Sequence, residues 1–354
     1  MSGVNQHYLP QFLMRGFAIR GGTEKSPIFK AIEHHKSRGV MPPRNIKSIG
    51  AQRNFYGKEG PGTVDDAIDK FENSLAPVIQ QLNLGAELTT SSRLQIASLV
   101  AHLITRAKPM RSFFEDAFYE GGDLIRGYAR HEQTFERFAE RMDDAELERI
   151  LREDAPKYGL VLPSGPIDGI KAQVRAELQR RKSDPVLKRK LAALLEAIAD
   201  SFNRDAAARS EEIHNRILSE KVDPEARVAE FQRLEWSVVH YPGEVLILPD
   251  VPIVTFASDR KGIRSILYKD EPPALVALPI SSERALIGSA VDGWLPMAGD
   301  INQVGARFAH EFFIARDATD ATRALVSTIG SAPPIFNDPD WITMKREALS
   351  NGPS

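Results

Sequence analysis

Hydrophobic positions recur at helical spacing through most of the first 230 residues. Segment 63–82 begins with the capping residue Thr63 and two acids, and its apolar side chains then follow every three or four positions. Segment 90–108 is apolar on nearly all sides, which predicts a buried central helix. Charged, amphipathic stretches predict further helices at 143–154, 170–184, 184–203 and 207–221.

Strand patterns occupy two other parts of the chain. Segment 27–35 alternates apolar and polar residues, as a half-buried strand does. After residue 232 the chain changes to short β-type runs divided by proline and glycine. No regular helices separate these runs, so an antiparallel sheet is favoured over a doubly wound one. Segment 301–316 then returns to a helical pattern.

Together these patterns predict an α+β fold that is mostly helical. A small antiparallel sheet is expected to combine N- and C-terminal strands, with a large helical insertion between them. The expected boundaries are an N-terminal part of a mixed core at 1–110, a helical region at 111–231 and a C-terminal β-rich part of the same core at 232–330. A tail, anchored by Trp341, would follow at 331–354.

Composition narrows the class of protein. Hydrophobic residues make up 42% of the chain and charged residues 27%, as is ordinary for a globular protein. The formal net charge of -2 argues against a protein that coats nucleic acid or a membrane surface with its whole surface. Cysteine is absent, which excludes disulfides, thiolate metal sites and cysteine nucleophiles. The N-terminus is unlike a signal peptide, and the apolar runs are too short for a membrane span. We expect a soluble, cytoplasmic protein without membrane contact.

Charge is nevertheless uneven along the chain. Between Arg15 and Lys58 ten Lys and Arg residues stand against two acids, Glu24 and Glu33. Such a surplus could bind nucleic acid or another phosphate-containing ligand. A solvated basic face is the alternative. The adjacent pair His34 and His35 is a weak metal signal, because neighbouring residues of a strand point to opposite faces.

The opening stretch from Asn5 to Phe17, NQHYLPQFLMRGF, mixes polar groups with large apolar ones. His7 precedes a helix start, where backbone N–H groups favour anions, and Gln11 and Arg15 lie one helical turn apart. This arrangement could hold a phosphate or carboxylate. Alternatively, the polar groups satisfy local backbone while the apolar ones build the core.

Several separated pieces of the sequence are similar to the bacterial domain of unknown function 4238 family. Its members open with His-Tyr-x-Pro-Gln-Phe-x-Leu-Arg-x-Phe, which the present opening matches, with Met14 preceding Arg15. Further matches in the N-terminal half are Asn45, Phe55, Tyr56, Glu72, Arg106 and Pro109.

The resemblance continues in the C-terminal half, where Trp236, Asp250, Pro252, Val254 and Asn302 fit the family's pattern. Two positions depart from it, since Pro249 replaces the usual serine and Val251 the usual asparagine. Roles that need those two side chains are therefore in doubt. The resemblance implies shared residues, and it implies no activity.

Seven of the shared residues are polar and have no evident role in the fold: His7, Gln11, Arg15, Glu72, Arg106, Asp250 and Asn302. Burying such groups unpaired costs a few kcal/mol each, so they pair with one another or bind something. We expect them to converge on one site.

One hypothesis is a hydrolase of phosphoesters, in small molecules or nucleic acid, with Mg²⁺ or Mn²⁺ as a candidate metal. His7, Glu72, Asp250 and Asn302 would be catalytic, with His7 as base or metal ligand and Asn302 orienting substrate or water. Gln11, Arg15 and Arg106 would bind the substrate, the arginines holding its phosphate.

A second hypothesis is a binding or sensing module in bacterial conflict or anti-phage defence. The helical middle would then contact a partner protein, and the polar set would be a satisfied structural network. In a third alternative the polar set is structural and the function lies elsewhere. Convergence in an open pocket would favour chemistry, whereas convergence in a dry core would favour a structural network.

Overall fold

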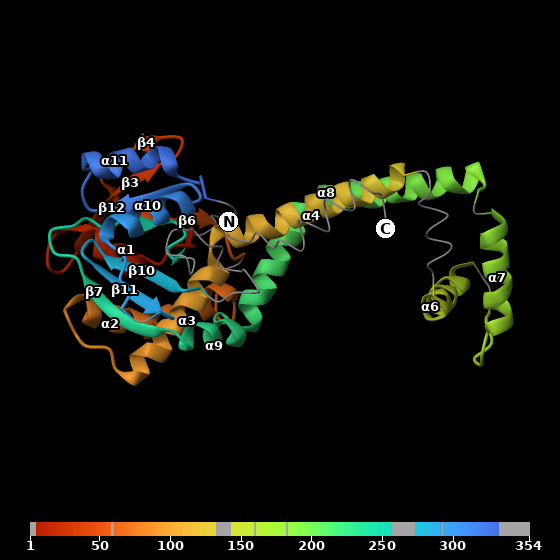
Figure 1. Ribbon diagram of the computed structural model, residues 1–354, viewed down its shortest axis with the longest axis horizontal. Coiled ribbons are helices and arrows are strands. Elements are labelled where there is room, and N and C mark those ends of the chain that lie inside the picture. Colours follow the sequence, from red (N-terminus) through yellow and green to blue (C-terminus); the bar gives the residue numbers. More distant parts are fainter. Residues whose placement is uncertain are drawn as a thin grey trace. The chain divides into compact units, whose positions relative to one another are not determined.

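The computed structural model describes residues 5–57, 60–131, 143–158, 161–181, 183–256, 273–291 and 293–332 (Figure 1). The predicted tail, including Trp341, lies almost entirely outside these ranges. The fold is α+β, as predicted, and it divides into two compact units. The first runs to Phe114 and resumes at Ala208, and the second comprises Glu115–Ala207.

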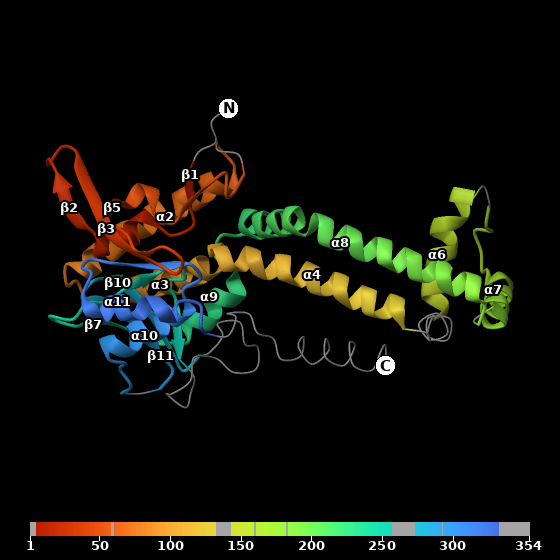
Figure 2. The same ribbon diagram turned by 90° about the horizontal axis from the view of Figure 1, so that it is seen from above.

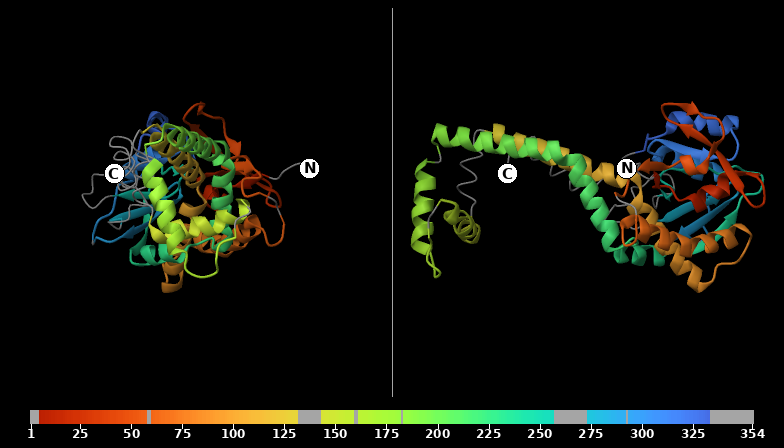
Figure 3. Two further views of the ribbon diagram at one scale, coloured as in Figure 1. Left: turned by 90° about the vertical axis from the view of Figure 1, so that its right-hand side faces the viewer. Right: turned by 180° about the vertical axis from the view of Figure 1, so that it is seen from behind.

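One antiparallel sheet of the first unit joins the two ends of the chain, as the sequence predicted. Its strands run in the order β2 (Ile19–Gly22), β3 (Pro27–His35), β12 (Phe312–Ala315) and β8 (Leu248–Pro249), and β4 (Gly39–Val40) and β5 (Arg44–Asn45) also pair with β3. Figure 3 shows these N-terminal segments in red beside C-terminal segments in blue.

A second antiparallel sheet lies within the apolar core. Its order is β7 (Glu235–His240), β11 (Arg284–Ser289), β10 (Leu275–Ser281) and β9 (Val254–Phe256). Nearly every residue of the two central strands is buried, so both faces of the sheet are covered. Trp236 packs over Gly288, its partner on the neighbouring strand, where a Cβ would approach the indole to 2.8 Å.

The N-terminal segment packs directly on β10. It forms α1 (Gln11–Met14) followed by the 3-10 turn η1 (Arg15–Phe17), and Leu13, Met14 and Phe17 are buried. Gly16 permits this approach, because a Cβ there would lie 2.1 Å from the carbonyl oxygen of Ile280. The predicted core residues of the opening stretch therefore lie where expected.

Two long helices of the first unit follow the predicted caps closely. Helix α2 (Val64–Asn83) begins after Thr63, whose side chain accepts from the backbone N–H of Asp66 at 3.3 Å. Helix α3 (Thr90–Arg106) begins after Thr89, one residue before the predicted cap, and is buried along most of its length. It packs against α9 (Glu225–Gln232).

Shorter elements complete the first unit. They are β1 (Asn5–His7) paired with β6 (Ala51–Arg53), the helices α10 (Ala298–Phe308) and α11 (Asp320–Leu325), and the turns η2 (Ile46–Ser48) and η4 (Val326–Thr328). In the part of the chain described, no helix is long and apolar enough to cross a membrane.

The second unit contains helical segments and their connections. Parts of α4 (Lys108–Arg130) and α8 (Pro185–Glu220) lie side by side (Figures 1 and 2), joined by the Arg126–Asp200 ion pair at 2.9 Å. The other elements are α6 (Asp144–Asp154), η3 (Ala155–Tyr158) and α7 (Asp168–Arg181). The helices predicted at 184–203 and 207–221 are one continuous helix, because no proline or glycine interrupts them.

Three histidines are completely buried in the first unit: His34, His102 and His214. Burial lowers the pKa of each ring to about 4, so all three are neutral at pH 7. His34 stacks on Phe313 with ring centroids 4.7 Å apart, and neither of its nitrogens has a well-formed hydrogen bond. His35 points to the opposite face and stacks over Phe312. The two rings therefore face apart, as the strand pattern predicted.

Replacing His34 with phenylalanine tests the cost of burying this ring. Its pKa is about 4 in the folded chain against an ordinary 6.5, so stability is lost as the pH falls from 6.5 toward 4. Phenylalanine does not titrate and keeps the stack. His34→Phe should therefore gain stability relative to the unmodified chain as the pH falls. The difference between their free energies of unfolding should grow by about 2 kcal/mol between about pH 7.5 and about pH 5.

Urea titrations at the two pH values measure this difference. His240→Phe, the same ring exchange at an exposed strand position, is the control. An excess that does not change with pH would contradict the burial argument.

Candidate functional site

A pocket of about 300 Å³ lies in the first unit, between the N-terminal segment and helix α2. Five of the seven predicted residues line it: His7, Gln11, Arg15, Glu72 and Arg106. The remaining lining residues are Asn5, Gln6, Phe12, Asp65, Ile68, Asp69, Asn73 and Ala76. We call this space the first pocket. The expected convergence is thus met for five residues.

Helix α2 supplies one whole wall of the first pocket through its periodicity. Asp65, Asp69, Glu72 and Asn73 follow one another at helical spacing, so they share a face of the helix. Asp69 and Asn73 are exposed, whereas Glu72 is half-buried, so the wall runs from solvent into the interior.

His7 ends strand β1 and places its imidazole in the lining of the first pocket. Burial, followed by the nearby Arg106 guanidinium, lowers the pKa of His7 below its ordinary 6.5, and a backbone hydrogen bond to Ile49 opposes the shift. The ring is therefore neutral at pH 7. Its Nδ1 atom is buried without a well-formed hydrogen bond. A neutral imidazole of this kind can accept a proton.

Arg106, at the end of α3, is 1% exposed and is surrounded by protein acceptors. Its Nη1 pairs with the Glu72 carboxylate, its Nη2 donates to the carbonyl of His7, and its Nε donates to the Tyr56 hydroxyl at 3.2 Å. These contacts occupy most of the guanidinium N–H groups. Arg106 lines the pocket, but its main partners are internal.

His102 lies one turn before Arg106 on α3 and completes this network. Its Nδ1 lies 3.0 Å from the carbonyl of Val222, which can only accept, so Nδ1 carries the proton. The neutral ring therefore presents a lone pair at Nε2, which accepts from Arg106 Nη1 at 3.4 Å. Glu72 consequently depends on Arg106, and not on His102, for charge compensation.

Arg15 differs from Arg106 because it is exposed. Its guanidinium lies over the ring of Phe29 on β3, 5.7 Å from the ring centroid. This cation–π contact holds the side chain, and within the described residues its guanidinium makes no ion pair or hydrogen bond. Arg15 is the arginine of the first pocket with the greater capacity to bind an anion.

The charges around the first pocket are mixed. Arg15 and Arg106 stand against Asp65, Asp69 and Glu72, and Glu72 is already paired with Arg106. Within the described ranges, no group of three or more His, Asp or Glu side chains is arranged to hold a metal ion. No described side chains can therefore be assigned to the predicted Mg²⁺ or Mn²⁺.

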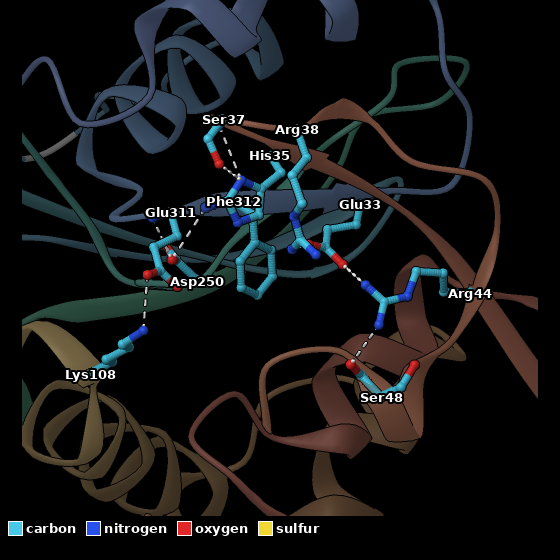
Figure 4. Close-up of polar contacts among 10 residues, drawn as sticks. All are labelled: Glu33, His35, Ser37, Arg38, Arg44, Ser48, Lys108, Asp250, Glu311 and Phe312. Atoms are coloured by element: carbon cyan, nitrogen blue, oxygen red, sulfur yellow. Dashed lines mark hydrogen bonds and ion pairs between the residues drawn. The ribbon is translucent and has the colours of Figure 1, made fainter. Parts of the chain in front are cut away.

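Asp250 lies away from the first pocket, which corrects the expectation that it forms one of the walls. Its carboxylate accepts backbone N–H groups of His310 at 2.7 Å, Glu311 at 2.8 Å and Phe312 at 3.3 Å. Figure 4 shows the contacts to Glu311 and Phe312. Burial raises the pKa of Asp250 to about 7, and the three donors oppose the shift. The side chain shapes the turn before β12.

Asn302 also lies outside the first pocket. From helix α10 its Oδ1 accepts from the backbone N–H of Ile247 at 2.9 Å, and its Nδ2 donates to the carbonyl of Val245 at 2.7 Å. The side-chain amide thus satisfies backbone groups of the segment before β8 that a neighbouring strand would otherwise bind. Neither Asn302 nor Asp250 joins the other five residues.

The basic stretch from Arg15 to Lys58 does not gather on the first pocket. Of the cations in this stretch that the structure describes, only Arg15 lines that space. Arg38 and Arg44 instead pair with the buried Glu33 carboxylate at 2.5 and 2.8 Å, as Figure 4 shows for Arg44. Lys58 lies outside the described residues. Nucleic-acid binding by this stretch stays a prediction.

The sequence interpretation missed several contributors. Asp65, Asp69 and Asn73 could have been found from their helical spacing with Glu72. His102 was hidden in an apolar helix, although its four-residue spacing from Arg106 was visible. Tyr56 matched the family pattern but was not among the seven candidate site residues. It is buried, and its hydroxyl also touches Arg106.

Comparison with known families identifies the chain. The family described as "Protein of unknown function (DUF4238)" matches residues 5–312. The match spans most of the chain, so the chain belongs to this family and the predicted resemblance is confirmed. No curated protein and no solved structure matches it.

Removing the charge of Glu72 should destabilise the fold. Glu72→Gln leaves the buried Arg106 guanidinium without its carboxylate, so we expect the free energy of unfolding to fall by roughly 3 kcal/mol. Asp69→Asn, one turn away and exposed, is the matched control and should change it by less than about 0.5 kcal/mol. Urea denaturation measures both. Equal effects of the two substitutions would show that the Glu72–Arg106 pair is not structural.

Asp250→Asn tests the structural role of the Asp250 carboxylate in the turn before β12. The amide keeps one acceptor oxygen where the carboxylate offers two, so we expect a loss of about 2 kcal/mol in unfolding free energy. Glu311→Gln, which removes a more exposed ion pair with Lys108, should cost less than about 1 kcal/mol. Denaturation of both variants measures the ranking, and the reverse order would contradict it.

Proposed function

We propose that the chain is a hydrolase of a small phosphoester and that the first pocket is its active site. The observation that carries the proposal is that a neutral imidazole, His7, and an exposed guanidinium without an acidic partner among the described residues, Arg15, line the same pocket. Arg106 pairs with Glu72 and also donates to the backbone carbonyl of His7, so this internal pairing fixes the wall that carries His7.

The proposed reaction needs one base and one anion site. Arg15 binds the phosphate oxygens, and His7 takes a proton from the attacking water. The oxygen of that water bonds to phosphorus as the bond from phosphorus to the ester oxygen breaks. The leaving oxygen takes a proton from solvent and His7 releases its proton to solvent, so the products are an alcohol and either inorganic phosphate, from a monoester, or a phosphomonoester, from a diester.

The lining favours a small, hydroxylated substrate over a polymer. A space of about 300 Å³ suits a small molecule. Carboxylates of Asp65 and Asp69 can accept hydroxyl donors, while Arg15 attracts the phosphate. A sugar or nucleoside phosphate carries both kinds of group.

A second candidate is a binding module that uses the same pocket without turnover. The dense internal pairing of Arg106 supports this candidate, since those contacts resemble a satisfied structural network. A role in defence and a protein partner for the helical middle stay predictions.

Phosphate release from small phosphomonoesters, and release of the alcohol from small phosphodiesters, both with and without Mg²⁺, test the hydrolase. For a substrate that is turned over, His7→Gln should lower kcat/KM by about 100-fold or more, and Arg15→Gln should mainly raise KM. Because the pKa of His7 is lowered, this base is protonated only below pH 6.5, so kcat/KM should fall on the acid side only below that pH.

Arg20→Gln is the matched control, because Arg20 is an exposed cation on β2 that does not line the pocket. Binding measured by calorimetry without release of phosphate would favour the binding module. Turnover that is the same in His7→Gln would exclude His7 as the base.

A further inference from the structure

A second pocket of about 480 Å³ adjoins the first one. Phe12, Arg15, Asn73 and Ala76 line both spaces, so the two pockets share a wall. The residues that line the second pocket alone are Gly16, Phe29, Pro77, Ile79, Gln80, Asn83, Leu84 and Ser281. Of the seven site residues predicted from the sequence, Arg15 alone lines the second pocket.

The two pockets differ in chemistry. Acids and amides dominate the first, whereas the second combines aromatic and aliphatic side chains with a few amides and carries no carboxylate. Arg15 stands between them, over the Phe29 ring. A ligand whose phosphate is bound by Arg15 can therefore extend an apolar, planar group into the second pocket.

Asn83 lines the second pocket, and its side-chain oxygen accepts no hydrogen bond from a described residue. Its Nδ2 donates to the carbonyl of Ile280 at 3.0 Å, which fixes the orientation of the amide. Its Oδ1 is buried and has no hydrogen-bond partner. A buried acceptor left in this state costs free energy, and a ligand N–H would remove that cost.

Pro77 leaves the backbone carbonyl of Asn73 without its usual helical donor. It lies inside helix α2 and has no N–H to donate to the carbonyl of Asn73, four residues earlier. Asn73 lines both pockets and Pro77 lines the second. The helix therefore lacks one internal hydrogen bond at the place where the two pockets meet.

We infer that the second pocket binds a planar aromatic ring that carries N–H donors, attached to the phosphate held by Arg15. A nucleoside monophosphate with an exocyclic amino group has this chemistry. Phe12 and Phe29 supply ring contacts, and the Asn83 amide and the Asn73 carbonyl supply acceptors. The inference rests on the proposed function for its phosphate site and adds the class of substrate.

Calorimetry on the full chain compares three probes that share a phosphate. They are adenosine 5′-monophosphate, purine riboside 5′-monophosphate, which lacks the amino group, and ribose 5-phosphate, which lacks the ring. We expect adenosine monophosphate to bind about tenfold or more tightly than ribose 5-phosphate, with the purine riboside between them.

Two variants assign this preference to the second pocket. Pro77→Ala gives the Asn73 carbonyl an N–H partner within the helix, and it should reduce the ratio of affinities for the first two probes to about one. Asn83→Leu should have the same effect. Because alanine suits a helix, Pro77→Ala is expected to fold, and its melting temperature checks this. Arg15→Gln should weaken all three probes.

The outcomes separate this inference from the proposed function. Equal affinity for all three probes, still lowered by Arg15→Gln, would overturn the inference and leave the phosphate site standing. Binding of no probe would overturn both. An amino-group preference that Pro77→Ala and Asn83→Leu leave unchanged would overturn the assignment to the second pocket.

Discussion

The buried guanidinium of Arg106 is the interaction on which the N-terminal half of the structure depends. A charge at 1% exposure is stable only when acceptors surround it, and here they come from three other segments. Strand β1 gives a carbonyl, the segment before α2 gives the Tyr56 hydroxyl, and α2 gives the Glu72 carboxylate. The charge thus fixes the end of α3 to three segments that are distant in sequence.

This constraint also defines the chemistry left for the pocket. Glu72 and Arg106 neutralise each other, and the buried His102 ring remains uncharged beside them. Of the residues predicted from the sequence, His7 and Arg15 then keep the capacity to bind a phosphate group, and both lie on the segment that the network fixes. A structural network and the proposed active site are therefore compatible in this protein, because the network supports the wall of the pocket.

The physical reasons for the successes and failures of the sequence interpretation differ. Helices α2 and α3 were predictable because their caps and apolar spacing are local properties. The grouping of His7, Gln11, Arg15, Glu72 and Arg106 was predictable in part because they belong to one family pattern. Asp250 and Asn302 belong to the same pattern, yet they bind backbone in loops. A sequence does not distinguish a polar side chain that faces a pocket from one that satisfies the backbone.

The sequence by itself determined the class of fold, the strand at 27–35, the Thr63 cap of α2 and the absence of cysteine chemistry. These follow from side-chain size, periodicity and composition. Only the tertiary structure decided which polar groups meet, that Arg106 is used internally, and that a second pocket lies beyond Arg15. Those facts depend on contacts between residues far apart in the chain, for which local patterns carry no information.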